Sequence, residues 1–241
     1  MYTMFIPSYN RAEKLTTLDL FPNAIVVCCE SQAEAYREAN PGAEIMVCPD
    51  KVQGNIARVR NWIINNSPTD YIVLVDDDIK YIGGFENATR FKLNREQLDT
   101  LLHSGFEMME DLGTVLWGIN LNTDRQNYDE YKPISLKSVV LGVFMGIKRV
   151  PGIRFDERLP LKEDYDYSLQ VLNKYRKILR LDKYHYEAEH LTNIGGCTNF
   201  RTYDKELQQL ELLQNKWGKD IVKFDIAKSI NPVVKVPIKG I

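Results

Sequence analysis

Three consecutive aspartates, Asp76 to Asp78, follow the apolar run Tyr71–Val75. The run predicts a buried strand, and the aspartates would then lie at its carboxyl end. Unpaired carboxylates are costly to bury, so the triplet indicates either a solvated turn or a site for a divalent cation. Few structural roles need three carboxylates at the end of a buried strand, and the neighbouring segments favour the cation site.

The elements that must position this triplet are strands and helices that alternate along the first half of the chain. Strands are expected at Thr3–Pro7, Ala24–Cys29, Glu44–Cys48 and Tyr71–Asp78, and helices at Gln32–Ala39 and Gly54–Asn65. This order predicts an α/β domain of three layers with a mostly parallel sheet. Ligands bind such sheets beyond the carboxyl ends of the strands, which is where Ser8 to Arg11 and the acidic triplet fall.

The second half is expected to add further strands and helices to the same domain. Strands are predicted at Val115–Asn120, Ser138–Ile147 and Lys177–Tyr186, and helices at 94–111, Lys162–Lys174 and Tyr203–Trp217. We expect residues 1–217 to form one domain. Residues 218–241 contain Pro232 and Pro237 and are expected to form an extended tail that packs on it.

Composition points to a cytoplasmic protein with one sizeable core. The chain has 241 residues, of which 44% are hydrophobic. Its first strand leaves no room for a signal peptide, and no run approaches the roughly 18 apolar residues of a membrane span. The four cysteines Cys28, Cys29, Cys48 and Cys197 form no CxxC pair, so we expect them to be reduced, mostly buried and without zinc. Neither a membrane nor an obligate protein partner is implied.

Charge is divided unevenly between the two halves of the chain. Residues 1–120 carry 10 Lys and Arg against 17 Asp and Glu, a net charge of −7, whereas residues 121–241 carry 21 against 16, a net charge of +5. An acidic half that holds a cation and a basic half that faces an anionic partner would use this asymmetry. A chance clustering of solvated lysines explains it equally well.

Four segments occur in the order seen in GT-A glycosyltransferases: Ile6–Arg11, Gly54–Asn61, Val75–Asp78 and Leu161–Asp166. More narrowly, the compact length and the ending His190–Cys197 resemble the TET-associated glycosyltransferases. This resemblance covers roughly residues 1–200. It implies a three-layer GT-A fold and transfer of a sugar from a nucleotide-sugar donor, with UDP as the expected nucleotide, onto 5-hydroxymethylpyrimidines in DNA.

The resemblance also implies a donor site built around Mn²⁺ or Mg²⁺. The cation would neutralise the charge that develops on the diphosphate, and Asp76, Asp78 and His190 are the expected ligands. Side chains alternate at a strand end, so Asp77 is expected to face the other way as a structural or helper residue. Residues expected to contact the nucleotide sugar are Pro7, Ser8, Tyr9, Asn10, Arg11, Asn55, Arg58, Asp76, Asp77 and Gly146.

Several of these assignments leave an alternative open. Both His185 and His190 fall in the window for a third metal ligand, and the Gly195-Gly196 loop favours His190. Arg58 is expected to contact the nucleotide, and the alternative is that Arg58 or Arg60 forms an ion pair with the acidic triplet. Other candidates have structural alternatives: Tyr9 and Trp117 are also typical of core packing, and the glycines of Gly142–Gly146 are typical of bulges.

Glu163 and Asp164 are the catalytic candidates. They begin a predicted helix, where the dipole stabilises carboxylates whatever their function. In the GT-A pattern the aspartate of such a pair removes the proton of the acceptor hydroxyl in inverting enzymes, so Asp164 is the expected general base and Glu163 its orienting neighbour. The preferred acceptor is 5-hydroxymethylcytosine or a related hydroxymethylpyrimidine in DNA. A saccharide or small-molecule acceptor, or a sugar nucleotidyltransferase activity, are the alternatives.

Overall fold

The computed structural model describes residues 1–87, 89–121, 123–188 and 201–238. Within them, ten strands form one mixed sheet with the order β3-β2-β1-β4-β9-β7-β10-β5-β6, and β8 pairs with β10. The strands are β1 (Thr3–Pro7), β2 (Ile25–Cys29), β3 (Ile45–Cys48), β4 (Tyr71–Val75), β5 (Ile79–Glu86), β6 (Thr89–Lys92), β7 (Leu116–Asn120), β8 (Ile134–Ser135), β9 (Phe144–Lys148) and β10 (Leu179–Ala188). The helices are α1 (Thr16–Leu20), α2 (Ala33–Ala39), α3 (Ile56–Asn66), α4 (Arg95–Asp111), α5 (Glu163–Tyr175) and α6 (Tyr203–Trp217).

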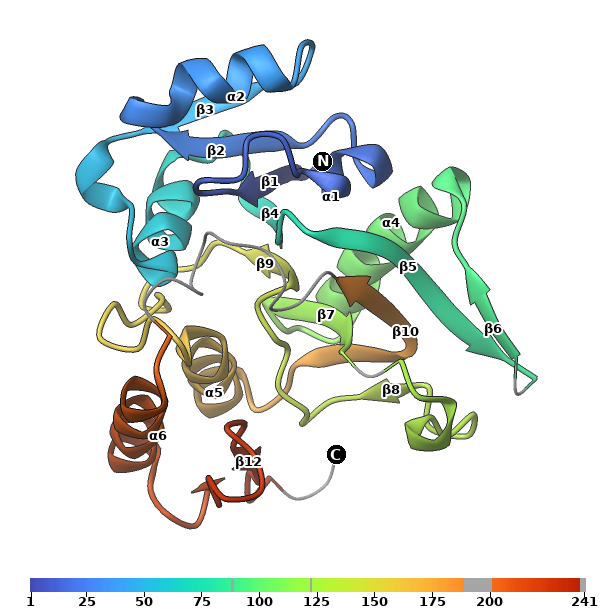
Figure 1. Cartoon of the computed structure of the whole chain (residues 1–241). Helices are drawn as coiled ribbons and strands as arrows, with labels where there is room; N and C mark the ends of the chain where they lie inside the picture. Colours follow the sequence, from blue (N-terminus) through green and yellow to red (C-terminus); the bar gives the residue numbers. More distant parts are fainter. Residues whose placement is uncertain (88, 122, 189–200, 239–241) are drawn as a thin grey trace.

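The α/β class is confirmed, and the pairing of the strands changes from parallel to antiparallel across the sheet. Strands β3, β2, β1 and β4 are parallel, whereas β9 runs antiparallel to both of its neighbours, β4 and β7. Helices cover both faces: α3 and α5 lie on one, α4 on the other (Figure 1). The parallel strands therefore end together at one edge, which is where the sequence predicted a site.

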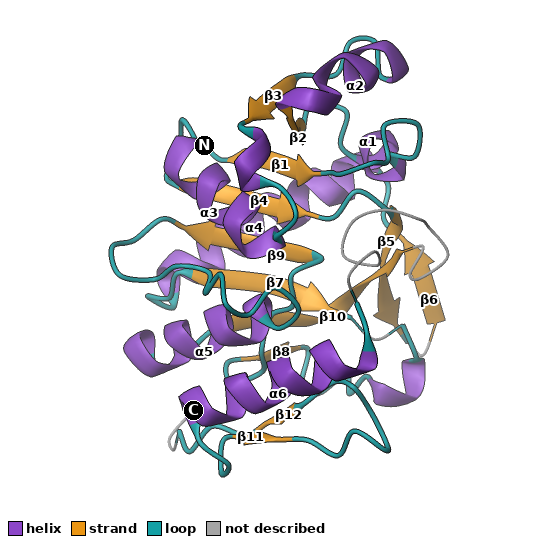
Figure 2. Cartoon of the chain, turned by 60° about the vertical axis from the view of Figure 1, so that its left-hand side comes forward, coloured by secondary structure: helices purple, strands orange, loops and turns teal. Residues whose placement is uncertain are grey.

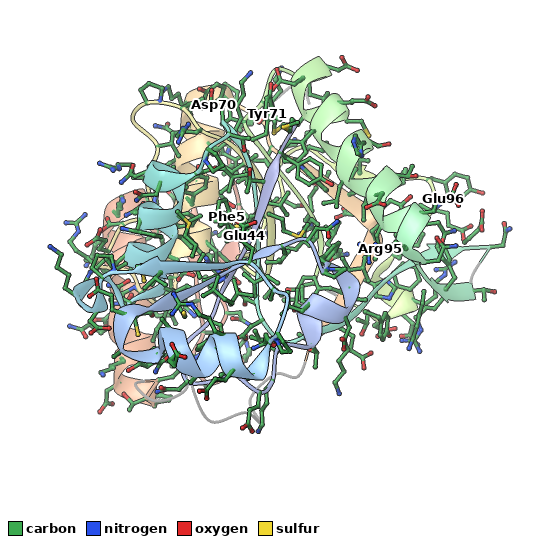
Figure 3. All side chains as sticks on the ribbon, turned by 90° about the horizontal axis from the view of Figure 1, so that it is seen from above. Phe5, Glu44, Asp70, Tyr71, Arg95 and Glu96 are labelled. Carbon is green, nitrogen blue, oxygen red and sulfur yellow. The ribbon has the colours of Figure 1, made fainter. Side chains whose placement is uncertain are left out.

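Alternation along the strands explains why the sheet is buried on both faces. In β4, Ile72 and Leu74 pack into the cluster under α3 and α5, and Val73 and Val75 pack into the cluster under α4. All four side chains are fully buried, as expected for a central strand with helices on both sides. Figure 3 shows Phe5 of β1 in the interior and Asp70 and Tyr71 at the edge where β4 begins.

Two of the differences between the structure and the sequence prediction concern strands β9 and β5 with β6. The predicted strand Ser138–Ile147 begins only at Phe144, because residues 138–143 form a loop that approaches the site. The hairpin of β5 and β6 was not predicted, since the pair Gly83-Gly84 interrupts the strand pattern. Gly83 is needed there because a Cβ would come within 2.6 Å of the Phe91 carbonyl oxygen and 2.9 Å of the His185 ring.

Residues after α6 form a short hairpin of β11 (Val222–Lys223) and β12 (Val233–Val234). It packs beside α5 and α6 (Figure 2), in a cluster that includes Leu159, Tyr165 and Leu213. Three cysteines, Cys28, Cys29 and Cys48, are buried and free, and Cys197 lies outside the described residues. No helix in the described part of the chain has the length and apolar character needed to cross a membrane.

Candidate active site

A pocket of about 490 Å³ opens at the edge where β1 and β4 end. It brings together the loop after β1, the acidic turn after β4, the start of α3 and the start of α5, although Pro7 and Asp164 are 157 residues apart in the sequence. The candidates that line it are Pro7, Ser8, Tyr9, Arg11, Asn55, Asp76, Asp77, Asp78, Glu163 and Asp164.

The three carboxylates of the acidic turn pair with two different arginines. Arg11 donates to Asp77 Oδ1 at 2.9 Å and lies 3.6 Å from Asp78 Oδ2, and Ser8 Oγ donates to Asp77 Oδ2 at 2.5 Å. Asp76 instead accepts from Arg60 Nη2 at 3.1 Å. Because β4 ends at Val75, the simple alternation expected of an extended strand does not continue into the turn. Asp77 is nevertheless bound by both Ser8 and Arg11, as a residue with a structural role would be.

Arg60 of α3 is the structural centre of the site. Its side chain is 3% exposed and donates to Glu163 Oε1 at 2.7 Å, to Asp76 at 3.1 Å and to the Gly142 carbonyl oxygen at 2.8 Å. The acidic turn and the Glu–Asp pair are therefore joined by a single guanidinium whose planar fork reaches both carboxylates. The sequence left open whether Arg58 or Arg60 pairs with the acidic triplet, and in the structure Arg60 does so.

Two buried hydroxyl groups hold the surrounding backbone in place. Thr17 Oγ1 donates to the Asp76 carbonyl oxygen at 2.6 Å and accepts from the Ile79 amide at 2.9 Å, which fixes both ends of the acidic turn. The Tyr36 hydroxyl lies 2.7 Å from Ser8 Oγ and accepts from the Arg11 amide at 3.2 Å. The loop after β1 and the turn after β4 are thus preorganised by α1 and α2.

Asp164 is oriented by two backbone amides. Its Oδ2 accepts from the Gly142 amide at 3.0 Å, and its Oδ1 accepts from the Tyr165 amide at 2.8 Å. Gly142 allows this approach because a Cβ there would come within 2.3 Å of Arg60 Nη1. A carboxylate in this arrangement faces the pocket and retains lone pairs for a further donor.

The local charge fits a divalent cation. Five carboxylates line the pocket, together with the cationic side chains of Arg11, Arg60, Lys162 and Arg201. Lys162 and Arg201 are both paired with Glu206, which does not line the pocket. Burial, and to a smaller degree Asp78 and Asp77, raise the pKa of Asp76 to about 7 although Arg60 opposes the shift. Burial and Asp164 similarly raise the pKa of Glu163 to about 8. Excess negative charge among oxygen donors is the environment that Mg²⁺ or Mn²⁺ requires.

A cation here would be held by Asp76 and Asp78, with nucleotide oxygens as further ligands. In the described residues, no three or more His, Cys, Asp or Glu side chains are grouped to hold a metal ion. The expected third ligand, His190, lies outside the described residues. The alternative, His185, is fully buried against Phe85, with ring centroids 4.6 Å apart, and is not among the residues lining the pocket.

Three other candidates are not brought to the pocket. Asn10 adopts a left-handed backbone conformation, with φ of 57°, and hydrogen-bonds Gln32. Arg58 donates to the Lys51 carbonyl oxygen at 2.7 Å and stays 43% exposed. Gly146 lies against the buried indole of Trp117, where a Cβ would come within 1.9 Å of Nε1, so both residues serve core packing.

Sequence reasoning missed further residues that line the pocket from the second half of the chain. Tyr165 and Tyr186 come from α5 and β10, and Arg201, Ile230 and Asn231 come from the segments around α6 and the C-terminal hairpin. Tyr165 lies within the motif Leu161–Asp166, which drew attention only to its carboxylates. No motif marks the other four, because their segments are placed only by tertiary packing.

The comparison with protein families agrees with this geometry. Residues 2–196 match the family model described as TET-Associated Glycosyltransferase. The chain belongs to the TET-associated glycosyltransferases. As a member of that family it is a glycosyltransferase, and the pocket is its candidate active site.

A curated relative of this glycosyltransferase is a phage protein. It is the Beta-glucosyl-HMC-alpha-glucosyl-transferase of Enterobacteria phage T6, which is 24% identical over 230 residues. The alignment covers 90% of the present chain and 81% of the relative.

Solved structures share the GT-A fold with this enzyme. Glucosyl-3-phosphoglycerate synthase from Mycobacterium tuberculosis, in complex with Mn²⁺, UDP-glucose and phosphoglyceric acid, superposes with a TM-score of 0.54 at 10% identity, covering 99% of this chain and 88% of that one. S. aureus TarS 1-349 superposes with a TM-score of 0.50 at 17% identity. That match covers 77% of this chain but less than two thirds, 59%, of TarS.

Glu163 is expected to make the protein less stable as the pH rises. Its pKa rises from 4.5 to about 8 on folding, so the folded protein binds more protons than the unfolded chain between these values. Stability from this group is therefore present at low pH and is lost as the pH rises through about 8. Relative to Glu163→Gln, the wild type in EDTA should lose up to roughly 1.4 kcal/mol of unfolding free energy per pH unit from about pH 5 to pH 8.

Urea unfolding at fixed pH values measures this difference directly. Comparison with Glu163→Gln cancels the contributions of titrating groups that do not interact with Glu163. Parallel stability profiles for the two proteins would show that Glu163 ionises normally in the fold.

Proposed function

We propose that the enzyme transfers a sugar from a nucleoside-diphosphate sugar to the hydroxyl group of a 5-hydroxymethylpyrimidine in DNA, with a divalent cation at the acidic turn. The observation that carries this proposal is Arg60, which joins Asp76 and Glu163 in one pocket at the carboxyl ends of the strands. Donor-binding and proton-accepting groups then face the same space. Support also comes from the Mn²⁺ and UDP-glucose of the mycobacterial structure and from the hydroxymethylcytosine named for the phage T6 relative.

The donor is assigned to the side of the pocket formed by the loop after β1 and the acidic turn. Asp76 and Asp78 would hold the cation, which would neutralise the negative charge that develops on the departing diphosphate. Ser8 and Arg11 position the acidic turn through Asp77. Since Arg11 and Ser8 also line the pocket, the same residues are available to the nucleotide.

Asp164 is assigned the general-base role. It removes the proton from the acceptor hydroxyl while the hydroxyl oxygen attacks the anomeric carbon and the nucleoside diphosphate leaves. The Gly142 and Tyr165 amides hold its carboxylate in one orientation during this step. Glu163, bound to Arg60, fixes the start of α5 and so the position of Asp164. This role requires inversion of the anomeric configuration.

The acceptor base must leave the duplex stack to reach the pocket. The hydroxymethyl group of a stacked pyrimidine cannot enter a pocket lined by Asp164, so the base is flipped out or presented in single-stranded DNA. If DNA is the acceptor, the reaction takes place in the cytoplasm, and in the cytoplasm of the host if a phage encodes the enzyme.

A second candidate acceptor is a sugar already attached to hydroxymethylcytosine. The name of the phage T6 relative specifies a glucosyl group on that base. The same general-base chemistry serves a sugar hydroxyl, so the two candidates differ only in the group that occupies the acceptor side.

A transfer assay tests the function directly. The enzyme is incubated with Mn²⁺, a panel of nucleotide sugars and DNA containing cytosine, hydroxymethylcytosine, hydroxymethyluracil or glucosylated hydroxymethylcytosine, and the nucleosides are analysed by mass spectrometry. We expect a hexose or pentose mass increment on a hydroxymethylpyrimidine and none on cytosine. Transfer to glucosylated DNA alone supports the second candidate. Transfer to a free saccharide with none to DNA contradicts both.

A further inference from the structure

The C-terminal hairpin contributes to the active site although it lies beyond the family match. That match ends at residue 196, and the hairpin loop, residues 224–232, follows it by almost thirty residues. Ile230 and Asn231 of this loop nevertheless line the same pocket as Asp76 and Asp164. The hairpin therefore adds a wall from outside the residues that the family model matches.

The hairpin is anchored on the side of the pocket that carries the general base. Val222 is fully buried and packs in one cluster with Tyr165, the residue after Asp164. Leu141, which precedes the glycine that binds Asp164, contacts the same cluster. This packing places the loop on the acceptor side and leaves the donor side to the loop after β1.

Two further contacts hold α6, which carries the hairpin, against α5. Lys162 and Glu206 form an ion pair at 2.7 Å with side chains 1% and 3% exposed. Trp217 Nε1 donates to Asp166 Oδ1 at 2.7 Å, and Asp166 is fully buried. The position of the hairpin is thus tied to the helix whose first turn contains Asp164.

The loop itself is ordered by its own hydrogen bonds. The amides of Lys228 and Ser229 both donate to the Asp225 carbonyl oxygen at 2.9 Å, and the Asn231 amide donates to Ser229 Oγ at 3.0 Å. Pro232, next to Asn231, is buried. Ile230 and Asn231 are therefore presented from a formed loop with a fixed end.

The side chains at this wall have the chemistry of a nucleobase site. Leu121, directly after β7, and Ile230 are each 39% exposed, and both line the pocket. Exposed aliphatic groups suit the flat apolar faces of a pyrimidine better than a polyhydroxylated sugar. Asn231 offers a donor and an acceptor, which match the alternating donors and acceptors at a pyrimidine edge.

We propose that residues 224–232 and Leu121 form the acceptor subsite, in which Ile230 and Leu121 pack on the faces of an extrahelical 5-hydroxymethylpyrimidine and Asn231 hydrogen-bonds its edge. This assignment rests on the proposed function, because it takes hydroxymethylated DNA as the acceptor. It directs the hydroxymethyl group towards Asp164 and makes the hairpin the determinant of base selectivity.

Variants of the loop test the subsite. Ile230→Ser should raise the KM for hydroxymethylcytosine DNA about 10-fold, the size expected for losing packing on one base. Asn231→Ala should change the ratio of kcat/KM for hydroxymethylcytosine over hydroxymethyluracil. Binding of UDP with Mn²⁺ should stay at the wild-type level in both. Val233→Ser is the matched control, because Val233 is an exposed aliphatic residue of the same hairpin that is not among the pocket-lining residues.

A binding measurement keeps the two proposals separable. Fluorescence anisotropy of a single-stranded oligonucleotide with one hydroxymethylcytosine, in UDP and Mn²⁺, should show weaker binding to Ile230→Ser and unchanged binding to Val233→Ser. Wild-type transfer to DNA with unaltered KM, selectivity and binding in the loop variants overturns the subsite and leaves the proposed function intact. Absence of any transfer to hydroxymethylated DNA overturns the function, whereas loss of oligonucleotide binding in Ile230→Ser still supports the subsite.

Discussion

Asp164→Asn is expected to lower kcat on the order of 100-fold or more while UDP and Mn²⁺ binding stays near the wild-type level. The amide keeps the size of the side chain and one of the two oxygens that accept from the Gly142 and Tyr165 amides, but it cannot accept the proton of the acceptor hydroxyl. Steady-state transfer to hydroxymethylcytosine DNA measures kcat, and a thermal-shift titration measures donor binding.

The configuration of the product provides an independent check on this assignment. A general base at Asp164 predicts a product anomer opposite to that of the donor, which NMR of the isolated nucleoside identifies. Near-normal turnover of Asp164→Asn, or a product with the configuration of the donor, contradicts the assignment. Asp166 is not an alternative base in the structure, because its buried carboxylate is bound to Lys216, Trp217 and Gln170 and does not line the pocket.

Arg60→Met is expected to destabilise the protein by about 3–5 kcal/mol, the usual cost of removing one partner of a buried ion pair. Met fills much of the volume of the arginine stem but leaves Asp76 and Glu163 without their shared cation. Activity should fall with stability, because Arg60 joins the donor and acceptor halves of the site. Urea unfolding provides the free energy.

Arg58→Met provides the matched control on the same helix. Arg58 is 43% exposed and lies 3.6 Å from Glu157, so its loss should cost less than about 1 kcal/mol. Glu163→Gln added to Arg60→Met should recover part of the loss, since it removes one of the two stranded carboxylates. Equal destabilisation by Arg60→Met and Arg58→Met would show that the buried network contributes nothing specific.

Much of the fold could be predicted because hydrophobic periodicity and strand order are local signals. β1 has the predicted bounds, and β4 and the helices α3 and α5 begin or end within two residues of them, apart from the acidic residues 76–78 that form a turn. The positions of Asp76 and Asp164 at the same pocket also follow from the topology, since strand ends meet at one edge. The family resemblance added the expected chemistry.

The parts that could not be predicted depend on tertiary contacts. The choice between Arg58 and Arg60 depends on which side of α3 faces the site. A signal was present: Arg60 falls between Ala57 and Ile64 on the buried stripe of the helix, where an arginine requires carboxylate partners. Ile230 and Asn231 offer no such signal, because only the packing of the hairpin on Tyr165 brings them to the pocket.

The most direct measurement of the central claim is a thermal-shift titration of UDP with Mn²⁺ on the wild type, Asp76→Ala and Asp78→Ala. Saturation at 100 times Kd should stabilise the wild type by about 2.7 kcal/mol. The two variants should fold, because the buried residues of β4 are unchanged and Arg60 keeps its bonds to Glu163 and to the Gly142 carbonyl oxygen, but they should gain little from the same mixture. Asp111→Ala, a change at the exposed end of α4, should behave as the wild type. Equal stabilisation of the wild type and both site variants would contradict a cation and nucleotide site at the acidic turn.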